Sequence, residues 1–464
     1  MKINELLDTE YDFDIAGIVD DSRNVRDNYL FVATKGFNVD HFDYIESAIS
    51  NGAVAVVADR EVNVKVPVFY VNNINDYYVE LCKKFNNVLD DDFKYIGITG
   101  TDGKTTSSSI VYQIISKAKK TALIGTNGMF INDEHYNTNN TTPCISELYD
   151  VLGIAKKNEC KQVVMEVSSE ALLHERVDKI KYSVVGYTNI TEDHLNVHGT
   201  IENYIACKMK LLDLLDDDGV VIYNGDDVNL CQIKKPNKYS YGVNLDCDFL
   251  ISDIVEKNNS VEFTITYCGK KYEINSPLVG IYNVYNITLA FAICLFSGIK
   301  EEDIIKAISE LKPILGRREY LDFGQDFDII LDYAHTFNGI KNILDSVKHY
   351  KKIITVTGAA GGREKEKRSK IGEVVLEKSD VVIFTMDDPR YEDVDDIIND
   401  LAGNTTKEYF RIKDRRDAIY FALNIANSNS VVLILGKGRD NYMAIEDKKV
   451  PYCDYDVIKD FYNM

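Results

Sequence analysis

The sequence has too little positive charge for a protein that binds nucleic acid by neutralising phosphates. Its 464 residues include 53 lysines and arginines against 74 aspartates and glutamates, a formal net charge of −21 at pH 7. Binding by phosphate neutralisation needs clustered basic side chains. We therefore expect no nucleic-acid partner, and an anionic small molecule must be bound by local positive groups.

Cysteine pairs, a signal peptide and long apolar runs are also missing. The nine cysteines include no CxxC pair, and an odd number without such a pair favours reduced thiols over disulfides or a zinc site. The N-terminus, MKINELLDTEYDFD, is acidic and lacks an apolar signal region. The longest apolar runs, 289–296 and 431–435, are too short to span a bilayer. We expect a cytoplasmic protein without a membrane partner.

The chain is too long for one ordinary hydrophobic core. Because β-rich and helical stretches alternate, we expect α/β domains, with breaks at the acidic run 90–92 and near residues 313–316. Three domains follow: a small α/β domain at 1–92, a P-loop ATPase-like, mostly parallel sheet at 93–314, and a Rossmann-like, doubly wound sheet at 315–464. Within the second domain, residues 248–276 have the pattern of an antiparallel insert.

The stretch YIGITGTDGKTT, residues 95–106, predicts a phosphate-binding loop between a strand and a helix. Glycines let backbone N–H groups close around an anion, and a helix N-terminus adds positive potential. Lys104 would reach terminal phosphates, and the Thr105 hydroxyl could ligate Mg²⁺. The usual GxxxxGKT spacing requires glycine where this sequence has Ile98, so the loop is a variant. An ordinary strand-to-helix turn is the alternative.

A carboxylate and an imidazole come just after two further predicted strands. Glu166 ends the strand in QVVMEVSS, and His194 lies in TNITEDHLNVHGT. Near a phosphate loop these groups suit a divalent ion, although each alone would be interpreted as a hydrogen-bonded loop residue. Polar clusters also follow three predicted strands of the last domain, at 357–363, 387–390 and 436–440, and we expect them to meet in one cleft.

Taken together, these stretches resemble the Mur ligases, the ATP-dependent amide-forming enzymes of peptidoglycan precursor synthesis. The shared motifs are GTDGKTT (100–106), NTT (140–142), EVSS (166–169), TN…DHL…HG (188–199), NGDD (224–227), GIYNVYN (280–286), GR (316–317), DYAHT (332–336) and GKG (436–438). The DSR loop (21–23), the 363–368 segment and DDPR (387–390) resemble the branch that adds a diamino acid to UDP-N-acetylmuramoyl-L-alanyl-D-glutamate.

The resemblance implies a role for individual residues, with ATP and Mg²⁺ as cofactors. ATP would be bound by Gly100, Thr101, Asp102, Gly103, Lys104, Thr105, Thr106, Asn283, Arg317 and Asp332. Magnesium would be held by Thr105, Glu166, His194 and Lys208, the last as a carbamate, and the catalytic group would be Lys104, Lys208, Glu166 and His194. UDP-MurNAc-dipeptide would contact Ser22, Thr141, Thr142, Ser168 and Arg176. The diamino acid would contact Arg363, Asp387, Asp388, Arg390, Gly436 and Asp440.

Arg390 favours meso-diaminopimelate over L-lysine as the amino acid added. It occupies the position where diaminopimelate-adding relatives carry arginine, and a guanidinium can bind the extra carboxylate with two hydrogen bonds. Asp440 would then accept from the distal amine. The alternative is that Arg390 only pairs with Asp387 or Asp388.

Several positions depart from the pattern of the family. The usual residues are replaced by Glu170, His174, Asn196, Ala360, Gly362, Arg439 and Asp440. Because these positions belong to substrate pockets more than to the ATP site, three alternatives stay open. They are a Mur-type ligase with another carboxylate acceptor, a folylpolyglutamate synthase-like enzyme, and a catalytically inactive binding protein. We expect a monomer.

Overall fold

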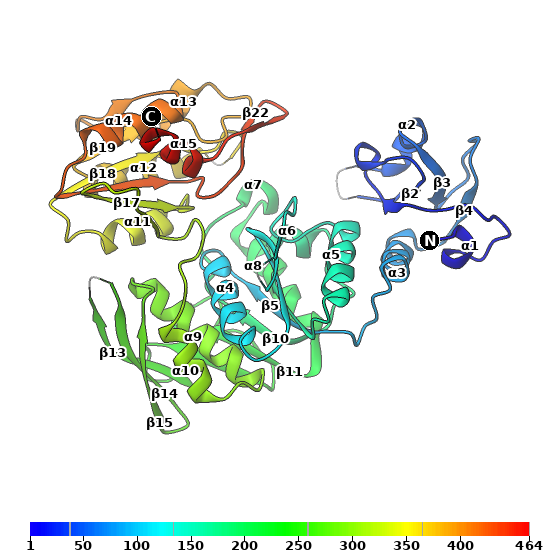
Figure 1. The fold of residues 1–464 in the computed structure, drawn as a ribbon, viewed down its shortest axis with the longest axis horizontal. Coiled ribbons are helices and arrows are strands. Elements are labelled where there is room, and N and C mark those ends of the chain that lie inside the picture. Colours follow the sequence, from blue (N-terminus) through cyan, green and yellow to red (C-terminus); the bar gives the residue numbers. More distant parts are fainter. Residues whose placement is uncertain (37–38, 133, 258, 364, 464) are drawn as a thin grey trace.

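Three larger α/β sheets follow one another along the chain, from blue to red in Figure 1. The computed structural model describes residues 1–36, 39–132, 134–257, 259–363 and 365–463, so Glu364 in the 363–368 segment lies outside the described residues. None of the described helices combines the length and apolar character needed to cross a bilayer. The expected α/β class is confirmed, while the domain boundaries at 92/93 and 314/315 stay predictions.

The N-terminal sheet has the order β1-β2-β3-β4, and all neighbouring strands are parallel. At the start of its last helix, the Asn73 side chain accepts from the Asp76 amide, and Asn87 ends that helix with a left-handed φ of 54°. The elements are β1 (Gly17–Val19), β2 (Tyr29–Val32), β3 (Ala53–Ala58), β4 (Val68–Tyr70), α1 (Ile3–Leu6), α2 (Ile45–Ser50), α3 (Ile74–Asn86) and the 3-10 helices η1 (Ser22–Asn24) and η2 (His41–Tyr44).

The central sheet has eleven strands, in the order β15-β14-β13-β12-β11-β10-β5-β9-β6-β7-β8. Its middle, from β13 to β6, is parallel, and antiparallel strands extend it at both ends. The antiparallel stretch expected at 248–276 is present, as a continuation of this sheet. The strands are β5 (Lys94–Thr99), β6 (Thr121–Gly125), β7 (Gly128–Ile131), β8 (Glu134–Tyr136), β9 (Gln162–Glu166), β10 (Tyr182–Tyr187), β11 (Leu215–Asn224), β12 (Lys238–Gly242), β13 (Phe249–Glu256), β14 (Val261–Tyr267) and β15 (Lys270–Ser276).

Two central helices pack against each other beside this sheet, namely α4 (Lys104–Ile115), which follows the phosphate loop, and α9 (Ile281–Phe296). Helix α9 is buried along most of its length, which explains why its sequence is apolar nearly all round. The helix that carries Lys208 ends at Met209 and continues as a 3-10 helix. The remaining helices are α5 (Ile145–Lys157), α6 (Ser169–Leu173), α7 (Leu195–His198), α8 (Ile201–Met209), η3 (Lys210–Leu214) and α10 (Glu301–Ser309).

The C-terminal sheet has the order β16-β17-β21-β18-β19-β20, and only β16 is antiparallel to its neighbour. Buried side chains form one cluster with α11, α12 and α13 and another with α14 and α15, so both faces are covered, as in a doubly wound sheet. The elements are β16 (Glu319–Leu321), β17 (Asp328–Asp332), β18 (Lys352–Thr357), β19 (Val381–Phe384), β20 (Phe410–Arg411), β21 (Ser430–Leu435), the hairpin β22 (Tyr442–Ile445) and β23 (Lys448–Pro451), α11 (Phe337–Ser346), α12 (Glu366–Lys378), α13 (Val394–Ala402), α14 (Arg415–Ile425) and α15 (Asp454–Tyr462).

A buried ion pair fastens α15 to α14, and its loss should destabilise the C-terminal part. The side chains of Arg415 and Asp454 are 0% exposed, with Nη2 2.7 Å from Oδ2. We expect Arg415→Met to lower the free energy of unfolding by about 3–5 kcal/mol, because it leaves a buried carboxylate without its partner. Urea unfolding checks this, with the exposed Arg416→Met as control. An equal loss in both variants would contradict the expectation.

Candidate active site

A cleft of about 820 Å³ lies between the central and C-terminal sheets. Both sheets contribute the loops that follow the carboxyl ends of their strands, where ligands of parallel α/β sheets usually bind. Seventeen predicted site residues line it: Thr101, Asp102, Gly103, Lys104, Thr105, Thr141, Ser168, Arg176, His194, Lys208, Arg317, Arg363, Asp387, Asp388, Arg390, Gly436 and Asp440. The others are not among the lining residues: Gly100, Thr106, Thr142, Glu166 and Asn283 are buried, Asp332 is half-buried, and Ser22 lies in the N-terminal sheet region.

The phosphate loop requires glycine at two positions. Gly100 has φ 146°, and a Cβ there would fall 1.9 Å from Thr188 Oγ1. Gly103 has φ 85°, and a Cβ there would fall 2.5 Å from Asn286 Oδ1. The loop is also held from outside, because the Asp102 amide donates to Asn189 Oδ1 at 3.0 Å. These contacts fix the backbone before a ligand arrives.

Two lysine ammonium groups meet at this loop. Lys104 Nζ donates to the carbonyl oxygens of Gly100 (3.0 Å) and Thr101 (2.7 Å). Lys208 Nζ, on α8, donates to the same Gly100 oxygen at 2.7 Å. Lys208 is 1% exposed, and burial, together with the charge of Lys104, holds its pKa well below the usual lysine value. Burial also lowers the pKa of Lys104. A lowered pKa gives Lys208 a larger neutral fraction, the form that reacts with CO₂.

Glu166 is a buried carboxylate in contact with the first turn of α4. Its Oε2 accepts from the Thr105 hydroxyl at 2.9 Å and from the Thr126 hydroxyl at 3.1 Å, while Oε1 accepts from the Thr126 amide at 3.0 Å. The carboxylate and the Thr105 hydroxyl predicted to hold magnesium are therefore in contact with each other. Thr126, which follows β6, is a site residue that the sequence did not reveal.

His194 is a neutral imidazole at neutral pH. Burial, with the nearby charges of Arg363 and Lys104, lowers its pKa to about 4. Its Nε2 lies 3.4 Å from Asp193 Oδ2, and its Nδ1 lies 3.2 Å from Arg363 Nη1. The pKa of Asp193 is lowered in turn, because His194, His335 and Lys367 outweigh its burial. Asp193 is a second site residue that the sequence did not reveal.

The side chains at the phosphate loop could hold magnesium only together with oxygen ligands from other sources. Among the described residues, no three His, Cys, Asp or Glu side chains gather as a metal site. Glu166, Thr105 and His194 are hard or borderline donors of the type that accept Mg²⁺, which usually completes its shell with phosphate oxygens and water. A carbamate on Lys208 would add two further oxygens beside the loop.

Residues just before β16 and beyond the end of β17 reach back to the phosphate loop. Arg317 Nη2 donates to Thr105 Oγ1 at 3.0 Å, and the Thr336 hydroxyl lies 3.2 Å from both carboxylate oxygens of Asp102. Asp332 accepts from the Arg318 amide at 2.6 Å and the Ala334 amide at 2.7 Å, and so shapes this turn. Asn283 lies in the first turn of α9 and donates to the Val279 carbonyl at 2.8 Å.

The phosphate loop and its contacts form the first wall of the cleft. Polar residues beside α6 and after β8 form the second wall. Thr142 connects it to the metal-ligand candidates, since its hydroxyl donates to the Glu166 carbonyl at 2.7 Å. Arg176 Nη1 donates to the Thr142 carbonyl at 3.1 Å, and the Ser168 amide donates to the Thr142 hydroxyl at 3.0 Å. Ser22 belongs to the N-terminal part, drawn in blue in Figure 1, and its carbonyl accepts from Asn51.

The third wall holds three carboxylates around one buried lysine. Lys437 Nζ lies 2.8 Å from Asp388 Oδ1, 3.3 Å from Asp440 Oδ2 and 3.9 Å from Asp387 Oδ1. Burial raises the pKa of Asp387 and of Asp440. Arg390 Nη1 donates to the Gly361 carbonyl at 2.7 Å. Lys437 lies in the GKG motif, so the motif marked the position, but the sequence did not show that it would be buried among acids.

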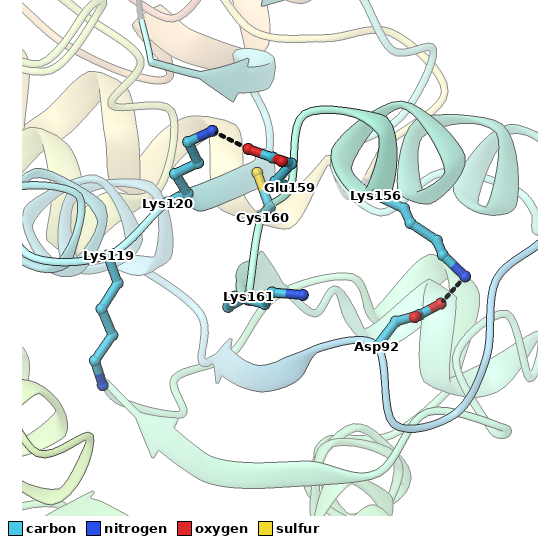
Figure 2. A pocket seen from close by; sticks show the side chains of 7 residues that line it. All are labelled: Asp92, Lys119, Lys120, Lys156, Glu159, Cys160 and Lys161. Carbon is cyan, nitrogen blue, oxygen red and sulfur yellow. Dashed lines mark hydrogen bonds and ion pairs between the residues drawn. The ribbon is translucent and has the colours of Figure 1, made fainter.

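A second cavity, of about 650 Å³, lies at the opposite edge of the central sheet, where β5, β6 and β9 begin (Figure 2). Two of its lysines are paired, Lys120 with Glu159 and Lys156 with Asp92. Lys156 also donates to the Asn87 carbonyl at 2.6 Å, so it fastens the linker from α3 to β5. This arrangement accounts for the cavity as part of the connection between the N-terminal and central sheets.

The fold and the cleft define a three-part α/β protein with a lysine-bearing phosphate loop beside a carboxylate and an imidazole. The Mur ligase middle domain matches residues 98–294, the Mur ligase glutamate ligase domain matches residues 316–438, and the Mur ligase family catalytic domain matches residues 14–90. The chain belongs to the Mur ligase family.

Curated relatives cover nearly the whole chain. UDP-N-acetylmuramoyl-L-alanyl-D-glutamate--2,6-diaminopimelate ligase of Caldanaerobacter subterraneus subsp. tengcongensis is 35% identical over 458 residues, 96% of this chain and 94% of the relative. The protein of that name from Bacillus licheniformis is 35% identical over 461 residues, 97% and 94% of the two chains. A solved structure of a protein of this name has a TM-score of 0.65 and 26% identity, and covers 100% of this chain and 99% of its own.

Lys104→Ala should abolish ATP-dependent phosphate release while leaving the protein folded. The substitution removes the ammonium at the phosphate loop, but Lys104 is no part of the apolar core. Phosphate release and thermal melting check this, with the exposed Lys120→Ala as control. Near-normal turnover in Lys104→Ala, with unchanged melting, would contradict the nucleotide assignment.

Lys208 should carry a carbamate at neutral pH. Incubation with ¹³C-bicarbonate is expected to give a carbamate signal in the NMR spectrum of the wild type and none in Lys208→Ala. Lys208→Ala should lose activity, and short carboxylic acids should restore part of it by supplying the missing oxygens. A fully active Lys208→Ala protein would show that this role is wrong.

Proposed function

We propose that the protein is an ATP-dependent, ADP-forming ligase that joins a diamino acid to the carboxylate of UDP-MurNAc-L-Ala-D-Glu. The observation that carries the proposal is one cleft that combines a phosphate loop with Lys104, the buried pair Thr105–Glu166, and a wall of acids and arginine from the C-terminal sheet. The names of the curated relatives support the choice of substrates.

The chemistry needs an activated carboxylate. A carboxylate is a poor electrophile, so one of its oxygens first attacks the γ-phosphorus of ATP, and ADP leaves. The neutral amine of the incoming amino acid then attacks the carbonyl carbon of the acyl phosphate, the C–O bond to phosphate breaks, and the nitrogen loses a proton. Two steps with good leaving groups replace one that has none.

Charge stabilisation at the phosphate loop lowers the barrier of the first step, the phosphoryl transfer. Lys104 offsets negative charge that spreads over the transferring phosphoryl group. Bound magnesium would neutralise further phosphate charge, held by Glu166, Thr105, His194 and the carbamate of Lys208. Arg317 bonds Thr105 from the C-terminal side, so it helps to position the phosphates and to exclude water.

Each of the three walls of the cleft would bind a different substrate, with ATP at the phosphate loop. Thr141, Thr142, Ser168 and Arg176 would bind the muramoyl peptide, together with Ser22 in the N-terminal part. The pocket of acids around Lys437, with Arg363 and Arg390, would bind the diamino acid. We further propose that the domain boundaries lie at 92/93 and 314/315, and that the protein acts as a cytoplasmic monomer.

Meso-diaminopimelate is the favoured amino acid. Arg390 can present two N–H groups to its extra carboxylate, and Asp388 and Asp440 are acceptors for an amine. Asp388 is paired with Lys437, and Arg390 donates to a loop carbonyl, so the contacts of this structure do not make Arg390 a partner of the nearby acids.

Two solved structures with low sequence identity show the likeness of the fold alone. A folylpolyglutamate synthase of Mycobacterium tuberculosis has a TM-score of 0.66 at 14% identity, and covers 77% of this chain and 91% of its own. MurF of Thermotoga maritima, solved with ADP, has a TM-score of 0.68 at 19% identity, and covers 90% and 93%. The pocket of acids beside Arg390 is what favours a diamino acid over glutamate.

Substrate choice gives the test of the proposal. With ATP and UDP-MurNAc-L-Ala-D-Glu, we expect kcat/KM for meso-diaminopimelate to exceed that for L-lysine by about a thousandfold or more, because lysine leaves the half-buried Arg390 guanidinium without a carboxylate partner. Arg390→Ala should lose most of this discrimination, whereas the exposed Arg416→Ala should keep it. Phosphate release and mass spectrometry of the product measure both.

Two results would contradict different parts of the proposal. A wild type that prefers lysine, or an Arg390→Ala protein with unchanged discrimination, would overturn the choice of amino acid and leave the ligase intact. A wild type that releases no phosphate with any amino acid of a broad panel would overturn the ligase itself.

A further inference from the structure

Arg439 makes its ion pair outside the loop that carries it. It lies in residues 436–440, after β21, in the wall proposed to bind the diamino acid. Its Nε donates to Glu319 Oε2 at 2.9 Å, and its Nη2 donates to Oε1. The guanidinium carbon also lies 3.6 Å from the ring centroid of Tyr455, on α15. The Glu319 side chain is only 8% exposed, so this two-point contact has little competition from water.

The same Glu319 carboxylate holds the turn that leads to the nucleotide side. Its Oε2 accepts from the Gly316 amide at 2.8 Å. The next residue is Arg317, whose Nη2 donates to Thr105 Oγ1 at 3.0 Å in the first turn of α4. One carboxylate therefore connects the loop 436–440 with the arginine that reaches the phosphate loop.

Packing around Tyr333 makes this connection rigid. A Cβ at Gly316 or at Gly438 would fall 2.4 Å from the Tyr333 ring, so both glycines lie directly against it. The Tyr333 amide donates to the Gly316 carbonyl at 2.9 Å, and the Arg317 guanidinium lies 4.5 Å from the ring centroid. A shift of either loop must move the ring, and the ring is in contact with the other loop.

We propose that Arg439 is a positioning residue that couples the amino-acid loop to the nucleotide site, acting through Glu319 and Gly316 on Arg317. The proposal rests on the proposed function only in treating the loop at Thr105 as a nucleotide site. Arg439 itself touches no residue of the phosphate loop in the contacts described above. Its effect on nucleotide binding is therefore a readout that a merely local role would not change.

Loss of Arg439 would disturb this connection because Glu319 is buried. Replacing Arg439 with an apolar side chain removes the ionic partner of a carboxylate that is almost fully buried. Such a carboxylate is unstable in place, and it must turn toward water or take up a proton. Either response weakens its contact with Gly316, and Arg317 loses its fixed position against Thr105.

The experiment measures the affinity of the full chain for AMP-PNP and Mg²⁺ by calorimetry, without acceptor or amino acid. We expect Arg439→Met to weaken binding about fivefold or more, the lower range of coupling between sites. Arg416→Met, which removes an exposed pair with Asp460 on the same part of the chain, is the matched control and should bind like wild type. Thermal melting shows that each variant is folded.

A second substitution, at Glu319, tests whether the weaker binding comes from the unpaired Glu319 charge or from a general disturbance of the fold. In Arg439→Met/Glu319→Gln the buried charge is gone, and the glutamine oxygen can still accept from Gly316. This double variant should bind AMP-PNP more tightly than Arg439→Met alone. If Arg439→Met fails to fold, Arg439→Lys takes its place, because lysine keeps the charge but loses the two-point contact and the stacking on Tyr455.

The results distinguish this proposal from the proposed function. An Arg439→Met or Arg439→Lys protein that melts and binds AMP-PNP like wild type overturns the coupling, whatever reaction the protein catalyses. A wild type that binds AMP-PNP but joins no amino acid overturns the ligase proposal. The coupling is then decided by comparing the AMP-PNP affinities of the wild type and the Arg439 variants. A wild type that binds no AMP-PNP overturns both.

Discussion

The buried Lys208 and the half-buried Lys104 share the carbonyl oxygen of Gly100, and this contact governs the nucleotide side of the cleft. Two positive charges at one carbonyl oxygen repel each other, and the repulsion is stronger away from water than in it. Burial first, and then the charge of Lys104, hold the pKa of Lys208 well below the usual lysine value, so keeping both groups as ammonium costs free energy. Conversion of Lys208 to a carbamate would replace the repulsion with attraction to Lys104 and to a divalent ion. The closeness of the two lysines is therefore the physical reason for the carbamate proposed on Lys208.

The cleft depends on groups that are distant in sequence. The central sheet supplies the phosphate loop and the buried pair Thr105–Glu166, and the C-terminal sheet supplies Arg317, Thr336 and Arg363 from its strand ends. These cross-contacts bring the wall of acids to the same space as the phosphate loop. Since the acyl phosphate is easily hydrolysed, joining three walls around it serves both orientation and exclusion of water.

Local patterns were enough to predict much of the fold and part of the site. The glycines and lysine of residues 100–105 carry their own conformational requirement, so the phosphate loop could be recognised without a structure. Glu166 and His194 follow buried strands, and parallel strands place such residues at one edge. The alternation at 248–276 predicted antiparallel pairing, but not that these strands extend the central sheet, because register with β12 depends on contacts elsewhere in the chain.

Other features depend on tertiary contacts that no local pattern records. Arg439 was noticed only as a departure from the family pattern, while its partner Glu319 lies 120 positions earlier. Lys437 would be solvated in most loops, and only the fold surrounds it with Asp387, Asp388 and Asp440. Ser22 is not among the described residues that line the cleft, so its role in binding the muramoyl substrate stays a prediction.

The central claim is that the phosphoryl group of ATP is placed on the acceptor carboxylate beside Lys104. The most direct measurement uses UDP-MurNAc-L-Ala-D-Glu with ¹⁸O in the reacting carboxylate, ATP and meso-diaminopimelate, and follows the released phosphate by mass spectrometry or by the ³¹P isotope shift. Because the carboxylate oxygen that attacks phosphorus leaves with it, the account predicts one ¹⁸O atom in each phosphate from fully labelled substrate. Amide product formed together with unlabelled phosphate would contradict it.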